Sequence, residues 1–312
     1  MSPQIPATPV HIASAIVGDA WSVLILREAC LFGQRRFVGF RDALGLNRAT
    51  LTSRLGSLTD AGLLERRSVA AGTDRHEYVP TVTAHEYVPV LLHMAEWGRR
   101  WMVEPEEGPL LELTHLDCGA PLHAELACSE CGEVITPHEV YAERPPHDAV
   151  RQVPDVKTRV PRLDQLERAR PCPIARCLAA TGDRWSVVVI QEAFFGLRHF
   201  DEFETRLAIA PNILSNRLGR LTDLGVLRHT PRRNGSRAEY RLTEEGLDLY
   251  GVSVTLRHWA MRSLGVADHL HVAHRPCGHD LDVLTRCRAC RAPIVAGSVD
   301  ARAVAPLVTP GT

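Results

Sequence analysis

The sequence predicts an α+β protein, mainly α with small β hairpins, in which one domain occurs twice in tandem. Residues 36–64 return at residues 199–227 with one constant offset of 163 and no gap. An internal repeat of this length indicates a duplicated domain, because solenoid units are far shorter. Each copy also contains two short helical stripes, a hairpin pattern and a set of cysteine and histidine residues, which together define the architecture.

Composition is ordinary for a globular protein and leaves the function open. The 312 residues have a formal net charge of −1, with 45% apolar and 23% charged residues. Two domains of about 150 residues fit this length. Arginine is nevertheless concentrated locally: residues 35–75 hold eight arginines against four acids, and residues 198–241 hold nine against five. Each stretch is therefore a candidate for phosphate contacts, although a solvated charged face gives the same pattern.

The repeated core of each copy predicts two helices joined by a short turn. Phe37, Phe40 and Leu44 fall on one face of the first helix. After a break, Asn47 is a good N-cap for a second helix, and in the other copy Pro211 is suited to the first helical position. The second helix has a leucine stripe that we expect to face the core, and small or polar residues opposite. The stripe comprises Leu51, Leu55 and Leu58, and Leu214, Leu218 and Leu221.

A hairpin follows each helix pair. Gly62 and Gly225 are expected to end the second helices. Two short strand patterns then flank a turn, at Ala70–Asp74 in the first copy and at Asn234-Gly235 in the second. Asn-Gly between such runs is a strong hairpin signal. A helix-turn-helix followed by a hairpin with arginines near its tip predicts a winged helix.

These motifs together resemble the HxlR family of winged-helix transcription regulators. The resemblance rests on a Gly-Asp-x-Trp helix entry, an Arg-x-Phe segment, the LxxRLxxL second helix and a Glu-Tyr strand, and it covers about two thirds of the chain. Cys172-Pro173-Ile174 matches the usual start of the family, whereas the first copy has Thr8-Pro9-Val10. The resemblance implies double-stranded DNA binding by a dimer. This chain differs by having two domains in tandem.

The amphipathic helices near residues 87–97 and 249–259 allow three interpretations. The resemblance implies a dimer interface, their periodicity is equally typical of a core within one domain, and the duplication allows the two copies to pack on each other. We expect an intrachain pseudo-dimer, with a homodimer as the alternative.

The polar face and the hairpins supply the candidate DNA contacts. Small and polar side chains let a helix enter a major groove and bond to base edges, while arginines reach the backbone. Arg54 and Arg217 adjoin the leucine stripe, so phosphate is their expected partner. The candidates are Arg48, Thr52, Ser53, Arg54, Arg66, Arg67 and Arg75 in the first copy, and Asn212, Ser215, Asn216, Arg217, Arg232, Arg233 and Arg237 in the second.

A cysteine and histidine cassette follows each winged helix. Each reads H-x2-C, nine residues, then C-x2-C, and the two are offset by 159. Three thiolates and one imidazole make a closed tetrahedral set for structural zinc, so we expect one ion per cassette in a small zinc-ribbon-like module. Disulfides, a thiol redox switch and nearby His123 or His279 as substitute ligands are the alternatives. The expected ligands are His115, Cys118, Cys128 and Cys131, and His274, Cys277, Cys287 and Cys290.

The remaining cysteines offer one candidate effector site. By the resemblance, Cys172 lies where some family members sense oxidants; the alternative is a small buried packing residue. A small-molecule or redox effector is therefore an expected partner.

The expected domains are contiguous along the chain. They are a winged helix at 1–104, a zinc-binding module at 105–140, a linker at 141–168 with a short helix near 163–169, a second winged helix at 169–265 and a second module at 266–302.

Other functional classes have little support in the sequence. The chain has no signal-peptide pattern and no apolar run long enough for a membrane span, so a cytoplasmic location is expected. The single lysine, Lys157, lies in the linker, and there is no glycine-rich phosphate loop or G-x-S-x-G motif, so an enzyme is not expected. The competing hypothesis is a winged-helix sensor or protein-interaction scaffold that uses its zinc modules for docking.

Overall fold

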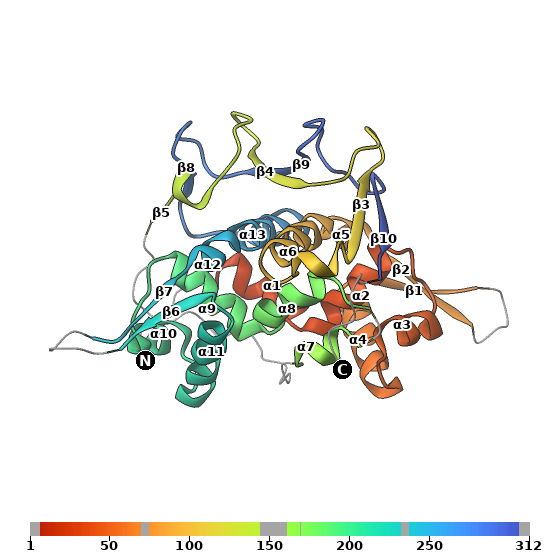
Figure 1. The fold of residues 1–312 in the computed structure, drawn as a ribbon, viewed down its shortest axis with the longest axis horizontal. Helices are drawn as coiled ribbons and strands as arrows, with labels where there is room; N and C mark the ends of the chain where they lie inside the picture. Colours follow the sequence, from red (N-terminus) through yellow and green to blue (C-terminus); the bar gives the residue numbers. More distant parts are fainter. Residues whose placement is uncertain (1–6, 70–74, 144–160, 169, 232–236, 306–312) are drawn as a thin grey trace. The chain divides into compact units, whose positions relative to one another are not determined.

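The fold, drawn in Figure 1, is that of a computed structural model, which describes residues 7–69, 75–143, 161–168, 170–231 and 237–305. The chain divides into two compact units, and each takes segments from both repeats. We call them by the repeat that supplies most of each. The first-repeat unit comprises Asp19–Glu125, Val160–Ala179 and Leu284–Thr312, and the second-repeat unit comprises Met1–Gly18, Leu126–Arg159 and Ala180–Val283.

The first-repeat unit is a winged helix with added strands. Its own repeat supplies α2 (Ala20–Cys30), α3 (Phe37–Leu44), α4 (Arg48–Asp60), the antiparallel wing β1 (Leu64–Ser68) and β2 (His76–Pro80), α5 (Val82–His85), α6 (Val88–Trp101), the 3-10 turn η1 (Pro105–Glu107) and β3 (Leu111–His115). From farther along the chain come α7 (Leu163–Leu166), the start of α8 (Pro173–Thr181) and β10 (Val299–Ala303).

The second-repeat unit repeats this plan. It contains α9 (Arg184–Phe194), α10 (Phe200–Leu207), α11 (Pro211–Asp223), the antiparallel wing β6 (Leu227–Thr230) and β7 (Glu239–Leu242), α12 (Glu244–Asp248), α13 (Tyr250–Ser263) and β8 (Val272–His274). The first repeat contributes α1 (Pro9–Val17), the 3-10 turn η2 (Pro137–Glu139) and β5 (Val140–Ala142). The chain crosses between units within β4 (Ala124–Cys128) and β9 (Val283–Cys287).

Local sequence explains the helix ends. The side chain of Asn47 accepts a hydrogen bond from the backbone N–H of Thr50 at the start of α4, and Pro211 opens α11, as predicted. Gly62 and Gly225 adopt φ values of 72° and 75° after these helices, a left-handed conformation that glycine takes without steric cost. The two leucine stripes are buried as predicted. The tips of both hairpins, Ala70–Asp74 and Asn234-Gly235, lie outside the described residues.

Helices that belong to one repeat pack in the unit formed mainly by the other repeat. Helix α1 packs on α9 and α13 of the second-repeat unit, where the hydroxyl of Thr8 donates to Oε1 of Gln191 at 3.1 Å. In the first-repeat unit, α8 approaches α6 closely at Gly98. A Cβ atom there would lie 2.0 Å from the carbonyl oxygen of Pro173, so only glycine permits this approach.

Strands are exchanged in the same way. In the first-repeat unit β3 pairs with β10 in antiparallel register, placing Val299 opposite His115. In the second-repeat unit β5 pairs with β8, placing Val140 opposite His274. Each pair therefore joins one strand from each repeat, whereas each predicted winged helix and each predicted zinc-binding module was a contiguous range within one repeat. Within the described residues, no helix is long and apolar enough to cross a membrane.

Candidate DNA-binding surface and metal centres

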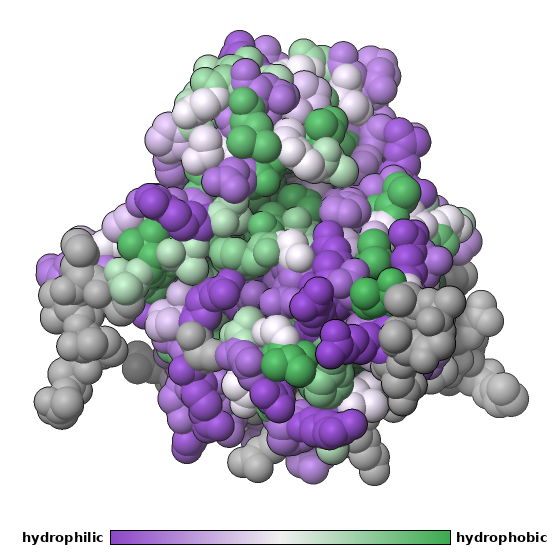
Figure 2. Space-filling model, turned by 90° about the vertical axis from the view of Figure 1, so that its right-hand side faces the viewer, coloured by the Kyte–Doolittle hydropathy of each residue, from purple (hydrophilic) through white to green (hydrophobic). Residues whose placement is uncertain are grey.

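The second helix of each helix-turn-helix exposes the polar face that the sequence predicts. Arg48, Thr52 and Ser53 are exposed on α4. Asn212, Ser215 and Asn216 are exposed on α11. In Figure 1, α4 lies at the end of its unit away from β3 and β10, and Figure 2 shows mainly hydrophilic residues at that height on the face it draws. Each helix is therefore free on its polar side to enter a groove.

The side chains of Arg54 and Arg217 are mostly buried, and each pairs with an aspartate of the protein. The Nε atom of Arg54 lies 3.0 Å from Oδ1 of Asp19, and that of Arg217 lies 2.7 Å from Oδ1 of Asp183. Both arginine side chains are only 17% exposed. The aspartates are the N-caps of α2 and α9, where their side chains accept backbone hydrogen bonds. The sequence interpretation missed this second role, although both the aspartate and the arginine recur in the two copies.

The wing arginines are exposed where the structure describes them. Arg66 contacts Nδ1 of His76 at 3.1 Å, and Arg67 pairs with Glu65 at 2.6 Å on the same strand. Arg75 is exposed immediately before β2. Arg237 is paired with Asp201 on α10. The predicted contacts Arg232 and Arg233 lie outside the described residues.

All eight predicted metal ligands fall into two clusters, but not into the predicted sets. His115 and Cys118 meet Cys287 and Cys290, while Cys128 and Cys131 meet His274 and Cys277. Each cluster therefore combines the H-x2-C knuckle of one cassette with the C-x2-C knuckle of the other. The first cluster lies wholly in the first-repeat unit and the second wholly in the second-repeat unit.

The predicted grouping within one cassette fails for a physical reason. Strand β4 separates the two knuckles of the first cassette, and β9 separates those of the second. An extended strand advances about 3.3 Å per residue, so five residues carry the chain roughly 16 Å. The nine residues between the knuckles of a cassette could also have formed a turn that brings the two knuckles together. Only the strands seen in the structure exclude that arrangement.

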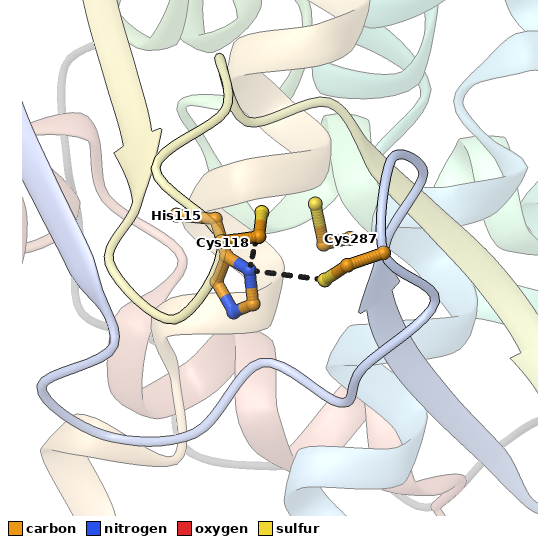
Figure 3. A group of neighbouring side chains, drawn as sticks. His115, Cys118 and Cys287 are labelled. Atoms are coloured by element: carbon orange, nitrogen blue, oxygen red, sulfur yellow. Dashed lines mark hydrogen bonds between the residues drawn. The ribbon is translucent and has the colours of Figure 1, made fainter.

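Distances within the clusters fit one tetrahedral ion. Candidate ligand atoms in each lie within 4.8 Å of one another. Figure 3 shows His115, Cys118 and Cys287 facing a common centre, with Nδ1 of His115 3.4 Å from Sγ of Cys118 and 3.3 Å from Sγ of Cys290. In the second cluster Sγ of Cys128 lies 3.9 Å from Sγ of Cys277. Zinc–sulfur bonds of about 2.3 Å place tetrahedral sulfurs about 3.8 Å apart, so the residues fit the ion.

The knuckle backbone adds to this fit. The N–H of Gly119 donates to the carbonyl of His115 at 2.8 Å, and that of Gly278 to His274 at 2.7 Å. Burial opposes ionisation of the Cys128 and Cys287 thiols, yet backbone N–H groups at the following knuckle positions lower the pKa of each. Both thiols are thus disposed toward the thiolate that binds a metal.

Cys172 is fully buried at the start of α8, with 0% exposure. Its sulfur lies 2.9 Å from Nη1 of Arg27 and accepts the backbone N–H of Ala175 at 3.4 Å. In the other unit, Thr8 caps α1 from the corresponding position. Cys172 is therefore buried and hydrogen-bonded in the way expected of a packing residue, and a redox-sensing role stays a prediction.

The fold and its two exposed second helices define a winged-helix regulator that binds DNA. Residues 16–106 and 180–268 match the HxlR-like helix-turn-helix family, which is more than half of the chain. The chain belongs to this family, with two tandem copies of its domain.

Curated relatives agree with this assignment. Uncharacterized HTH-type transcriptional regulators from Mycobacterium bovis and Mycobacterium tuberculosis are each 37% identical over 146 residues, which is 47% of this chain and 91% of the relative. A regulator of the same description from Synechocystis is 38% identical over 96 residues, covering 30% of this chain and 70% of the relative.

Proposed function

We propose that this regulator reads one asymmetric DNA operator with two unlike half-sites, one for α4 and one for α11. The observation that carries the proposal is the chemical difference between the two exposed faces. Helix α4 presents a cation, a hydroxyl pair and small residues, whereas α11 presents two amides and a hydroxyl. Arginine is suited to guanine and asparagine to adenine in the major groove, so the half-sites should differ in base composition.

Arg48, Thr52 and Ser53 are the proposed base readers of the first half-site. The guanidinium of Arg48 lies 6.0 Å from the ring centre of Phe37, which restrains it near the N-terminus of α4. Asn212, Ser215 and Asn216 are the proposed readers of the second half-site. The wing arginines 66, 67, 75, 232, 233 and 237 are proposed to contact flanking phosphates.

For Arg54 and Arg217 we propose a positioning role in place of the expected phosphate contact. Each joins the second helix to the capped end of α2 or α9 through its aspartate. The pair fixes the angle at which the reading helix leaves the core. The carboxylate takes up Nε of each guanidinium, so a phosphate would meet an arginine that is already engaged by a counter-charge.

Zinc is the proposed ion of both clusters, two per chain and structural. Three thiolates and one imidazole are a set that zinc favours, and four protein ligands leave no open position for catalysis. Each bound ion would fasten a knuckle from one repeat to a knuckle from the other. Together with the exchanged α1, β5 and β10, this supports a pseudo-dimer formed within one chain.

The experiment is selection of bound duplexes from a random DNA library with zinc-replete protein at two salt concentrations. We expect one enriched site with dissimilar halves, and binding that weakens steeply with salt because counterions are released. Footprinting then gives the stoichiometry. A perfect palindrome protected by two chains would contradict the asymmetric operator, and no enrichment at either salt would favour a sensor or protein-interaction scaffold.

A further inference from the structure

The second-repeat unit contains a cavity that none of the DNA-binding or metal-binding residues uses. Its volume is about 250 Å³, and it lies between α1, α9 and α13 on one side and the β5 and β8 strands on the other. Phe194, Val254, Val272 and Leu281 give it mainly apolar walls. A cavity of about 150 Å³ accommodates benzene, so this one has room for one or two aromatic rings.

One wall of the cavity carries an unsatisfied hydrogen-bonding group. Tyr250 is 8% exposed, and its hydroxyl has no hydrogen-bond partner within the part of the chain that the structure describes. Its ring meets that of Phe194 edge-on, with centroids 6.0 Å apart, which holds it in the wall. A buried hydroxyl without a partner destabilises the empty site, so a ligand that accepts a hydrogen bond from it gains binding energy.

Two arginines line the same cavity, and the nearby carboxylate of Glu139 also acts electrostatically on the Tyr250 hydroxyl. Arg257 lines the cavity but is engaged by Asp268 at 2.6 Å and by the carbonyl of Leu281 at 3.2 Å. Arg275, an exposed residue, also lines the cavity, and its Nε donates to the carbonyl of Val140 at 3.3 Å. Among the described residues no carboxylate pairs with Arg275. Its charge therefore favours an anion over a cation.

The polar wall exists in only one of the two repeats. Alignment of α6 with α13 places Val88 at the position of Tyr250 and Ala95 at that of Arg257. In the cassettes, Leu116 corresponds to Arg275. A hydroxyl and two guanidinium groups are thus replaced by three apolar side chains, so this particular set of polar groups occurs in the second repeat alone.

We propose that this cavity is an effector site for a small aromatic carboxylate, bound once per chain. The rings fill the apolar walls, the carboxylate accepts the Tyr250 hydroxyl proton in a hydrogen bond, and Arg275 supplies the opposing charge. Such a molecule contacts α1 and α13 of the winged helix and the strands of the metal module together, so it is placed to link the two. The site does not depend on DNA binding.

The test is isothermal titration of the full, metal-replete chain with 2-naphthoate, without DNA. We expect one molecule per chain and at least about tenfold weaker binding of the cation 2-naphthylmethylamine. Tyr250→Phe removes only the hydroxyl and should weaken 2-naphthoate binding about tenfold, as should Arg275→Gln, because each loses a charge-assisted contact. Arg262 lies on an exposed part of α13, the helix that carries Tyr250, so Arg262→Gln should leave binding unchanged.

A cavity-filling variant completes the design. Val254→Trp should abolish binding, with circular dichroism and thermal unfolding verifying that the unit is folded. Absence of 2-naphthoate binding at millimolar concentration would overturn the proposal. So would two molecules per chain, equal binding of the cation, or binding unchanged by both Tyr250→Phe and Arg275→Gln. None of these outcomes bears on operator recognition, which is measured separately.

Discussion

At the residue scale, Arg217 lies in a DNA-reading helix but has a structural role, because its side chain pairs with Asp183. The carboxylate caps α9 through the N–H groups of Trp185 and Ser186 and also accepts from Arg217. Asp183 is almost fully buried, so the loss of Arg217 removes its hydrogen-bonded counter-charge and leaves the more distant interaction with Arg220. Asn216, one residue earlier, points to solvent.

This contrast gives a matched pair of variants. Arg217→Ala should reduce the free energy of unfolding by about 2 kcal/mol, because a charge-assisted hydrogen bond to a buried carboxylate is lost. Asn216→Ala should change stability by less than about 0.5 kcal/mol and should weaken DNA binding about tenfold or more. Urea denaturation and fluorescence anisotropy measure the two effects. Equal stabilities of the two variants would contradict the positioning role.

A second residue-scale device is His11, which is buried against α9. Its Nδ1 lies 2.7 Å from the hydroxyl of Thr8, and its Nε2 lies 4.0 Å from Glu192, which is paired with Arg206. Burial, followed by the charges of Arg206 and Arg184, lowers the pKa of His11 to about 3. The folded protein therefore keeps this imidazole neutral at neutral pH.

The sign of the resulting pH dependence follows from the depressed pKa. The unfolded chain takes up a proton on His11 below about pH 6.5, whereas the folded chain does so only near pH 3. Stability is therefore intact above pH 6.5 and falls as pH decreases, by about 2 kcal/mol between pH 6.5 and 5 at roughly 1.4 kcal/mol per unit. Denaturant titrations should show this slope reduced in His11→Gln. An unchanged slope would contradict the neutral, buried histidine.

At the element scale, the helices could be predicted from the sequence, but the pairing of strands and of metal-binding knuckles could not. The leucine stripes, the Asn47 cap and the left-handed glycines after α4 and α11 all follow from local periodicity and turn chemistry, and the structure confirms them. The knuckle pairing depends instead on which strands meet. Equal cassettes offer equal ligands, so sequence spacing alone could not distinguish pairing within a cassette from pairing between them.

The cavity beside α13 shows the same limit. Tyr250, Arg257 and Arg275 are separated along the chain and belong to no motif, so no local pattern indicated that they share a cavity. The sequence signal that could have been used is a difference between the repeats: the corresponding residues of the first repeat, Val88, Ala95 and Leu116, are apolar. A difference between two copies of one domain is a useful pointer to a site that only one copy needs.

Operator asymmetry is an element-scale prediction. Arg48→Ala should weaken binding about 10–100-fold and relax the preference for guanine in one half-site, while the other half-site keeps its preference. The matched variant Asn212→Ala should relax an adenine preference in the opposite half-site only. Repeating the library selection with each variant measures both effects. Relaxation of both half-sites by either variant would contradict separate reading by α4 and α11.

At the scale of the whole molecule, the exchange of segments distinguishes this chain from a pair of independent domains joined by a linker. Each compact unit needs helices, strands and metal ligands from both repeats. A homodimer of single-copy proteins brings its interface together only at sufficient concentration, whereas a covalent tandem holds both halves at a fixed effective concentration. The duplication thus allows the two reading helices to diverge while they stay in one regulator.

The most direct test of this exchange is the zinc content of paired ligand variants, measured by mass spectrometry of the purified, metal-replete chain. Two ions per chain are expected in the parent. Cys118→Ala with Cys290→Ala removes ligands of one cluster, so one ion should remain. Cys118→Ala with Cys128→Ala damages both clusters, so close to none should remain. The opposite order, with one ion left in the second variant and none in the first, would show that each cassette binds its own ion and would contradict the account.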